Sequence, residues 1–271
     1  MLYSTLAFSM MHICVKSLTH IPAHEIILFR SAVTLIISFA FLRYHRLPVF
    51  GTNRKILVLR GTVGVIALTL FFITLQRIPL AAAVTLQHLS PIFTVLFSML
   101  FLSEKVKPSQ WLFFLVAFSG VLLIKGFDER IEPIFMLLGI LSAVFSGLAY
   151  VCIRILRHTD HAYNVVFYFP LVATPVMGIW CMINWVQPMG YEWGLLILAG
   201  VFTQVGQIFM TRSLQAEEAS SVAILKYLSL VYALGFGYFL FDETYPWMSL
   251  AGIGLIFAGV GLNTFRRKVS L

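Results

Sequence analysis

Long apolar runs alternate with short polar joints along the whole chain. A helix needs about 20 apolar residues to cross the hydrocarbon core of a bilayer. The pattern therefore predicts an all-α integral membrane protein with ten transmembrane helices, near Leu2–Leu18, His24–Leu42, Ile56–Gln76, Ala82–Leu102, Ser109–Ile124, Ile134–Leu156, Ala162–Val186, Trp193–Leu214, Ala219–Phe241 and Pro246–Phe265.

The first run has the position of a signal peptide but not its other features. It has no basic segment before it, and no small-x-small cleavage site follows Leu18, so we expect a retained helix. The run is short for a span, which leaves open a start site a few residues upstream.

Composition excludes the soluble classes. Apolar residues make up 60% of the chain and charged residues only 11%, whereas soluble domains carry about 25% charged residues. Three cysteines are too few for a disulfide scaffold, and the apolar content excludes disorder. We expect an integral membrane protein without a soluble domain.

The distribution of basic residues gives an orientation. A net charge of +8 would fit nucleic-acid binding, but most Lys and Arg lie at the ends of apolar runs, as membrane anchors do, so no nucleic-acid partner is expected. With a cytoplasmic N-terminus, twelve basic residues face inward and four outward. This asymmetry predicts an inner-membrane protein with both termini in the cytoplasm. The inward set is Arg43, Arg46, Arg54, Lys55, Lys105, Lys107, Arg154, Arg157, Arg212, Arg266, Arg267 and Lys268, and the outward set is Lys16, Arg77, Lys125 and Arg130.

The two halves of the chain resemble each other. A shift of 139 positions places Gln76–Gly120 on Gln215–Gly259 without a gap, and a shift of 138 fits the start of the chain. We therefore predict two five-helix repeats, residues 1–130 and 131–271. Because five is odd, the second repeat is inverted relative to the first, which is typical of secondary transporters. Coinciding pairs include Gly61/Gly200, Leu89/Leu228, Ser90/Ser229 and Glu104/Glu243, with Lys16/Arg154 at the shorter shift.

Several segments resemble the signature of EamA-type permeases in the drug/metabolite transporter superfamily. In the first half these are Ile78–Ala83, Leu89–Phe93, Leu102–Glu104 and Phe118–Ile124; the looser second copy comprises Ala219–Val222, Tyr227–Ser229, Asp242–Glu243 and Gly252–Gly261. The resemblance implies ten helices in a pseudo-twofold basket, a central cavity, alternating access, and amino acids or other small metabolites as substrates. Pro91 departs from the repeat because Leu230 stands at its equivalent position, so a proline hinge is expected in one repeat only.

Polar side chains in the fourth and ninth spans are the first candidates for substrate binding. Polar groups at membrane depth are costly and usually face a cavity or a partner. Gln87 and His88 in the fourth span are repeat-equivalent to Lys226 and Tyr227 in the ninth, and such positions approach each other in inverted-repeat carriers. Pro91 should break the helix just after them and free a carbonyl near Gln87.

Two of these residues have alternative interpretations. Lys226 either extends its ammonium to the membrane interface or provides a cation for a substrate carboxylate or phosphate. A histidine changes charge near neutral pH, so His88 either bonds a neighbouring helix or acts as a ligand or proton relay.

Further candidates lie in the second, third, sixth and eighth spans. Arg30 either has a structural role, as an ion pair with Glu25 or a bond between helices, or binds substrate. We expect Arg60, one turn from the cytoplasmic end of its span, to be an interfacial anchor. Gln204 and Gln207 share a helix face by their spacing and are expected to line the cavity, as is Tyr150.

Motifs that would indicate catalysis are absent from the sequence. It contains no Walker A loop, HExxH, GxSxG or Cys/His metal cluster, so we expect no enzyme activity, no cofactor and no metal. Glu104, Asp242 and Glu243 lie in joints, where helix capping explains them. A cavity with cations and amides but no carboxylates favours a substrate that bears a carboxylate.

The predicted function is a permease that moves a small polar metabolite by alternating access. An amino acid or related zwitterion or carboxylate fits best, with an aromatic or purine part left open. S-adenosylmethionine or another organic anion is the alternative within the same fold. A membrane-embedded enzyme and a non-transporting scaffold are the alternatives from other classes. Expected partners are the substrate and the lipid bilayer, and both a monomer and a homodimer remain open.

Overall fold

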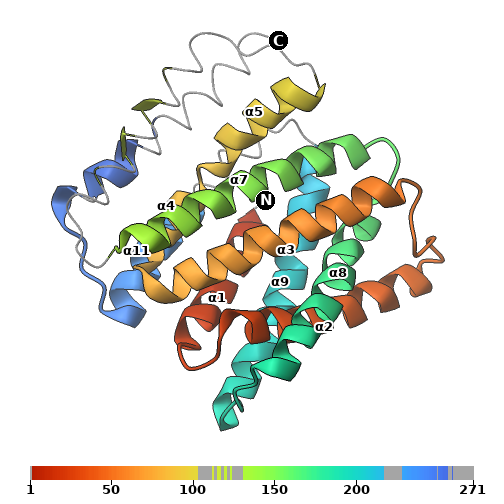
Figure 1. Ribbon diagram of the computed structural model, residues 1–271, viewed down its shortest axis with the longest axis horizontal. Helices are drawn as coiled ribbons and strands as arrows, with labels where there is room; N and C mark the ends of the chain where they lie inside the picture. The colour runs from red at the N-terminus through yellow and green to blue at the C-terminus, as the bar shows by residue number, and fades with distance from the viewer. Residues whose placement is uncertain are drawn as a thin grey trace.

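The computed structural model describes residues 2–102, 131–216, 228–248 and 250–255, with isolated positions between 112 and 123 and at 258. Over these residues the protein is helical and contains no strand (Figure 1). The helices are α1 (Leu2–Ser17), α2 (Ala23–Tyr44), α3 (Arg54–Arg77), α4 (Leu80–Gln87), α5 (Ser90–Leu102), α7 (Pro133–Leu156), α8 (Ala162–Ile183), α9 (Gly190–Ala216) and α11 (Leu228–Phe241).

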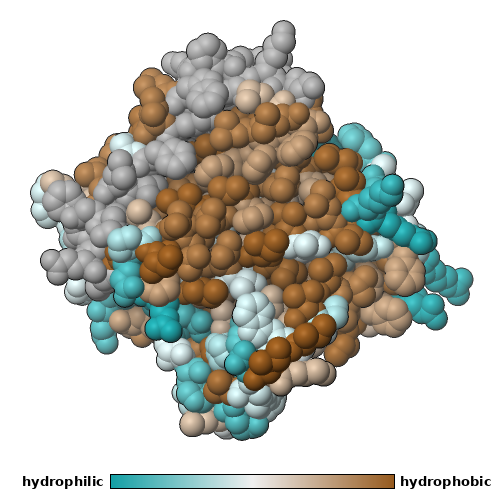
Figure 2. Space-filling model, viewed as in Figure 1, coloured by the Kyte–Doolittle hydropathy of each residue, from teal (hydrophilic) through white to brown (hydrophobic). Residues whose placement is uncertain are grey.

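The protein is a multi-pass membrane protein. Six of the described spans are long and apolar enough to cross a bilayer, with α4 and α5 together forming one of them. Figure 2 shows hydrophobic residues across the middle of one face and hydrophilic residues at its right and lower-left edges, near the helix ends. Most of the predicted fifth span, the start of the ninth and the end of the tenth lie outside the described residues.

Helix starts coincide with capping residues in the polar joints. The Asn53 side chain accepts a bond of 3.4 Å from the backbone N–H of Ile56 and caps α3, and His161 does the same for α8 through Tyr163. Pro133 occupies the first turn of α7, where its missing N–H costs nothing. These local signals explain why the predicted bounds lie within a few residues of the observed ones.

The fourth span is interrupted in its middle. Helix α4 ends at Gln87 and α5 begins at Ser90, with His88 and Leu89 in a turn between them. Pro91 lacks the N–H that would bond the Gln87 carbonyl, so the backbone ladder breaks where the sequence predicted. The break brings Gln87 and His88 to the end of a helix inside the protein.

Hydrogen bonds between the polar joints show that the joints lie in two groups, one at each end of the molecule. At one end, Gln76 Nε2 donates to the Leu18 carbonyl over 2.9 Å, and Glu25 Oε2 accepts from the backbone N–H of Val186 over 3.1 Å. At the other end, the Asp160 carboxylate accepts from the backbone of Thr52 over 2.5 Å. Alternate joints therefore meet each other, as they do when successive helices cross in opposite directions.

Helix pairs from the two halves pack against each other. Helix α3 lies along α7 and α1 along α9, while α2 packs against α8 (Figure 1). A serine hydroxyl bonds a backbone carbonyl in each of the pairs α1–α9 and α3–α7. Ser4 Oγ donates to the Gly206 carbonyl over 2.8 Å, and Ser142 Oγ donates to the Ala67 carbonyl over 2.7 Å.

Two glycines allow a close approach between helices. A Cβ on Gly61 of α3 would lie 2.8 Å from Val172 of α8, and a Cβ on Gly200 of α9 would lie 2.6 Å from Val33 of α2. Because such distances are shorter than normal van der Waals contact, any larger residue would push these helices apart. The coincidence of Gly61 with Gly200 in the repeat is thus a packing feature.

Candidate functional site

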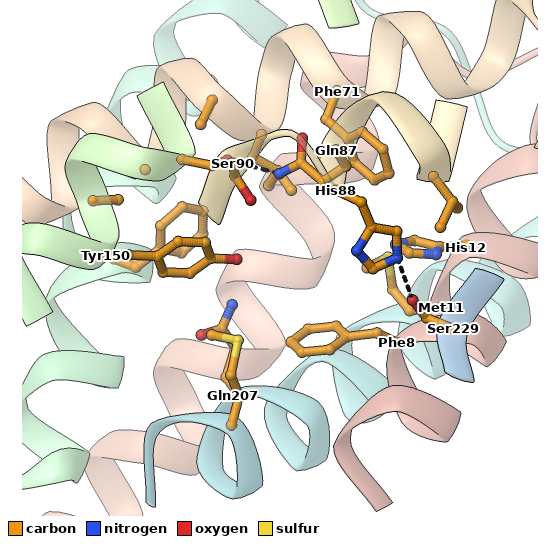
Figure 3. Close-up of a pocket in the computed structure, with 18 of the residues that line it drawn as sticks. Phe8, Met11, His12, Phe71, Gln87, His88, Ser90, Tyr150, Gln207 and Ser229 are labelled. Atoms are coloured by element: carbon orange, nitrogen blue, oxygen red, sulfur yellow. Dashed lines mark hydrogen bonds between the residues drawn. The ribbon is translucent and has the colours of Figure 1, made fainter. Parts of the chain in front are cut away.

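A cavity of about 190 Å³ lies between the helices of the two halves. Its lining residues belong to many helices or to the turns between them, namely α1, α2, α3, α4, α5, α7, α8, α9 and α11. Figure 3 shows its labelled side chains converging from several helices. Its polar lining residues are Thr5, His12, Arg30, Arg60, Gln87, His88, Ser90, Ser146, Tyr150, Gln207 and Ser229.

Gln87 lies on the cavity wall in a fixed orientation. Its Nε2 donates to Ser146 Oγ over 2.7 Å, and its Oε1 lies 3.0 Å from Ser142 Oγ, whose single proton is shared with the Ala67 carbonyl. Both serines belong to α7, so the second half of the chain orients a side chain from the first. The prediction that Gln87 faces the cavity agrees with this position.

Two histidines lie together at one side of the cavity. His88 Nε2 is 3.0 Å from Ser229 Oγ of α11, and the His12 imidazole lies next to the His88 ring (Figure 3). The sequence predicts Ser229 as the repeat counterpart of Ser90, and the structure brings the two spans that carry them together. Sequence reasoning did not select His12. Its position in the middle of the first apolar run was the signal available.

Arg30 lies in the cavity wall with only 1% of its surface exposed. Its guanidinium carbon is 5.4 Å from the ring centroids of both Phe72 and Phe169, which gives cation–π contacts. Its Nε has no hydrogen-bond partner among the described residues. The structural pair with Glu25 is not formed, because a Glu25 oxygen accepts from the backbone N–H of Val186 in a joint instead.

Arg60 also lines the cavity and is 4% exposed. Its guanidinium carbon is 5.5 Å from the Phe169 centroid, and Nη2 donates to Gln207 Oε1 over 3.5 Å. Its Nε and Nη1 have no partner in the described parts of the chain. The expectation of an interfacial anchor is wrong. The number of turns from the helix end indicates how deep Arg60 lies in the membrane, but Arg60 lies on the side of α3 that faces the inside of the protein.

The other predicted site residues fall into three groups. Gln207 and Tyr150 line the cavity, and the Tyr150 hydroxyl points into it (Figure 3). Gln204 lies outside the lining and exchanges hydrogen bonds of 3.1 and 2.9 Å with Ser38 of α2. Lys226 and Tyr227 lie outside the described residues.

The charge of the cavity wall is positive. Arg30 and Arg60 line it, and the described lining residues include no Asp or Glu. A buried charge without a counterion is costly, and such groups usually mark a binding site in membrane proteins. Among the described residues no group of three or more His, Cys, Asp and Glu side chains could hold a metal ion.

A buried ionic cluster joins the two halves at the end that carries Gln76. Both carboxylate oxygens of Glu243 accept from the backbone N–H of Leu80, over 3.0 and 2.9 Å, and Lys16 Nζ lies 2.8 Å from Oε1. Tyr245 donates its hydroxyl to Oε2 over 2.6 Å, and Lys16 also donates to the Ile78 carbonyl over 2.8 Å. The capping role expected of Glu243 is confirmed, at the start of α4 in the opposite half.

Comparisons with known proteins agree with this architecture. The sequence profile of the EamA-like transporter family matches residues 1–126 and again residues 133–265. The chain belongs to the EamA-like transporter family. It is accordingly a transporter and not an enzyme, as the motif search predicted.

Individual relatives of this EamA protein are also transporters. It is 35% identical over 256 residues to a pseudopaline exporter of Pseudomonas aeruginosa, covering 93% of this chain and 90% of that protein. It is 30% identical to human solute carrier family 35 member G1, covering 93% and 74%, and 25% identical to an S-adenosylmethionine uptake transporter of Rickettsia felis, covering 83% and 77%. A solved crystal structure with 17% identity superposes with a TM-score of 0.74 over 99% of this chain and 96% of that one, which shows the shared fold.

Proposed function

We propose that this EamA transporter moves a small metabolite bearing a carboxylate, such as an amino acid or related zwitterion, across the inner membrane by alternating access. The observation that carries the proposal is the pair of buried guanidinium groups, Arg30 and Arg60, that line the cavity with unpaired N–H donors and no described carboxylate near them. Carboxylates match guanidinium donors in charge and geometry.

The proposed architecture is ten helices in two inverted five-helix repeats. Three sets of contacts support it. The bonds Ser4–Gly206 and Ser142–Ala67 are related by the same 138- and 139-residue shifts that align the sequence. The close contacts Gly61–Val172 and Gly200–Val33 are likewise related by 139. Pairing of α3 with α7 and of α9 with α1 follows from such a pseudo-twofold axis.

Alternating access requires that each end of the protein closes and opens in turn. The Glu243 cluster is the group of contacts proposed to close one end. It ties Lys16 and the start of α4 to the segment after α11, so the two halves cannot separate at that end while it is intact. The break before Pro91 gives the fourth span a place to bend, which supports the hinge. With cytoplasmic termini, as the basic residues indicate, this closure faces away from the cytoplasm.

The names of the relatives suggest two substrates, and the positive charge of the cavity disfavours one of them, S-adenosylmethionine. Pseudopaline is the named substrate of one relative and S-adenosylmethionine of another. Two arginines beside a cavity repel a sulfonium cation and attract an anion. S-adenosylmethionine also bears an α-carboxylate, but its sulfonium and ammonium groups make it a net cation. It is therefore the alternative, together with other organic anions, behind an amino acid or related carboxylate. His88 is the proposed proton relay if transport is proton-coupled.

A thermal-shift measurement on the purified protein in detergent tests the carboxylate requirement. Each amino acid is compared with the amine that has the same side chain and no carboxylate: leucine with 3-methylbutylamine, and phenylalanine with phenethylamine. We expect at least one of the amino acids to raise the melting temperature and its amine not to. A ligand at a hundred times its Kd stabilises by about 2.7 kcal/mol, which is easily measured.

The outcome that contradicts the proposal is equally clear. If the amines stabilise the protein and the amino acids do not, the cavity is not an anion site. If no compound in the set stabilises it, the proposed substrate class is wrong.

A further inference from the structure

We propose that the substrate carries two anionic groups, one held by Arg30 and the other by Arg60. This inference rests on the proposed function and names the substrate class more closely. A single carboxylate is enough for the function as proposed above. The arrangement of the two arginines within the cavity favours a dicarboxylate.

The two guanidinium groups have different neighbours. Arg60 donates to Gln207 Oε1 over 3.5 Å, whereas the guanidinium carbon of Arg30 lies 5.4 Å from the ring centroid of Phe72. Figure 3 shows Gln207 and Tyr150 on one side of the cavity and His12 and His88 on the other. The cavity wall therefore presents two guanidinium groups in different surroundings, and a separate anionic group can bind to each.

The aromatic ring of Phe169 limits how far apart the two cationic groups can be. Both guanidinium carbons lie within 5.5 Å of its centroid, so twice that distance is the most that can separate them. Because this limit is short, a dicarboxylate with a short carbon chain is long enough to reach both guanidinium groups at once.

The number of unmet donors also fits two anionic groups. Nε of Arg30 and both Nε and Nη1 of Arg60 lack partners among the described residues, although the side chains are buried. One carboxylate neutralises one of the two positive charges and leaves the other buried alone. Two carboxylates neutralise both, which removes the cost of an uncompensated charge at membrane depth.

Ligand pairs that differ by one charge test this inference. The probes are the dicarboxylates malonate, succinate, glutarate and adipate, each with its monomethyl ester, which keeps the chain and removes one charge. Binding to the purified protein is measured by thermal shift and calorimetry. We expect one dicarboxylate to bind at least about tenfold more tightly than its ester, because a charge-assisted hydrogen bond is lost.

Substitution of each arginine shows whether the preference comes from the pair. Arg60→Gln should bring the dicarboxylate and its ester within about twofold of each other, and Arg30→Gln should do the same. Arg54→Gln, an exposed arginine on the same helix α3, should keep the full preference. Circular dichroism and elution volume verify that each variant is folded, and Arg30→Lys and Arg60→Lys, which keep the charge, should retain part of the preference.

The possible failures are distinguishable. Equal binding of a dicarboxylate and its ester to the wild-type protein overturns the two-anion inference but leaves a carboxylate transporter, with both arginines on one carboxylate. Binding of neither, together with failure of the amino acids above, overturns the proposed function as well. A preference that survives both glutamine variants places the anion site elsewhere.

Discussion

Glu243→Gln is expected to lower the stability of the protein by about 3 kcal/mol, the cost of breaking a buried ion pair by removing one partner. The side chains of Glu243 and Lys16 are only 8% and 14% exposed, so water replaces little of what is lost. The neutral amide also accepts less strongly from the Leu80 N–H, which the carboxylate holds with both oxygens. Thermal unfolding in detergent measures the change.

The neighbouring acid is a matched control. Asp242 is exposed and has a positive φ of 49°, a backbone conformation that asparagine tolerates well, so Asp242→Asn should leave the melting temperature nearly unchanged. Lys16→Met should destabilise less than Glu243→Gln, because the carboxylate keeps its bonds from Leu80 and Tyr245. Equal stability of Glu243→Gln and Asp242→Asn would show that the cluster does not hold the two halves together.

Arg60→Met is expected to have the opposite effect on the ligand-free protein and to stabilise it by about 1–4 kcal/mol, the range found when buried ion pairs are replaced by apolar residues. Arg60 is buried, and two of its nitrogen atoms lack partners among the described residues. The flexible methionine side chain fills comparable space without a charge. Such a gain marks a residue kept for binding at a cost in stability.

The same variant should lose the response to ligand. A carboxylate that raises the melting temperature of the wild-type protein should have little effect on Arg60→Met, measured in the same scan. Arg54→Met provides the control, because that arginine is exposed at the start of α3 and should change neither value. A large loss of stability in ligand-free Arg60→Met would instead indicate a structural role for this arginine.

Much of the fold could be predicted from the sequence because the bilayer imposes simple length and polarity requirements. The apolar runs gave the described helices within a few residues, and Asn53, Pro133 and His161 explain their starts. Pro91 predicted the broken fourth span, since a missing N–H has a local consequence. The sequence shows that Gly61 and Gly200 coincide in the predicted repeat, whereas their close contacts with neighbouring helices are seen only in the structure.

The site was predicted less completely because burial depends on the side of a helix, and not on its depth alone. The predicted site residues Gln87, His88, Gln207, Tyr150 and Arg30 all line the cavity, and their role in binding stays a prediction. Arg60 was assigned to the interface from its distance to the helix end.

Two other residues, Gln204 and His12, can be placed only once the contacts between helices are known. Gln204 shares a helix face with Gln207 by spacing, yet it bonds to Ser38 of a neighbouring helix. His12 was missed because nothing in the first span alone indicates that α1 packs against α9, α11 and α3 around the cavity.

Transport by reconstituted protein tests the central claim most directly, namely that the cavity containing Arg30 and Arg60 is the substrate site of a carboxylate transporter. The measurement is uptake of radiolabelled glutamate and succinate into proteoliposomes preloaded with the same unlabelled compound. We predict uptake of at least one of them by the wild-type protein and by Arg54→Gln, and background uptake by the Arg30→Gln/Arg60→Gln double variant, with all three reconstituted in equal amounts. Uptake by the double variant at the wild-type rate, or no uptake of either compound by the wild-type protein, would contradict the claim.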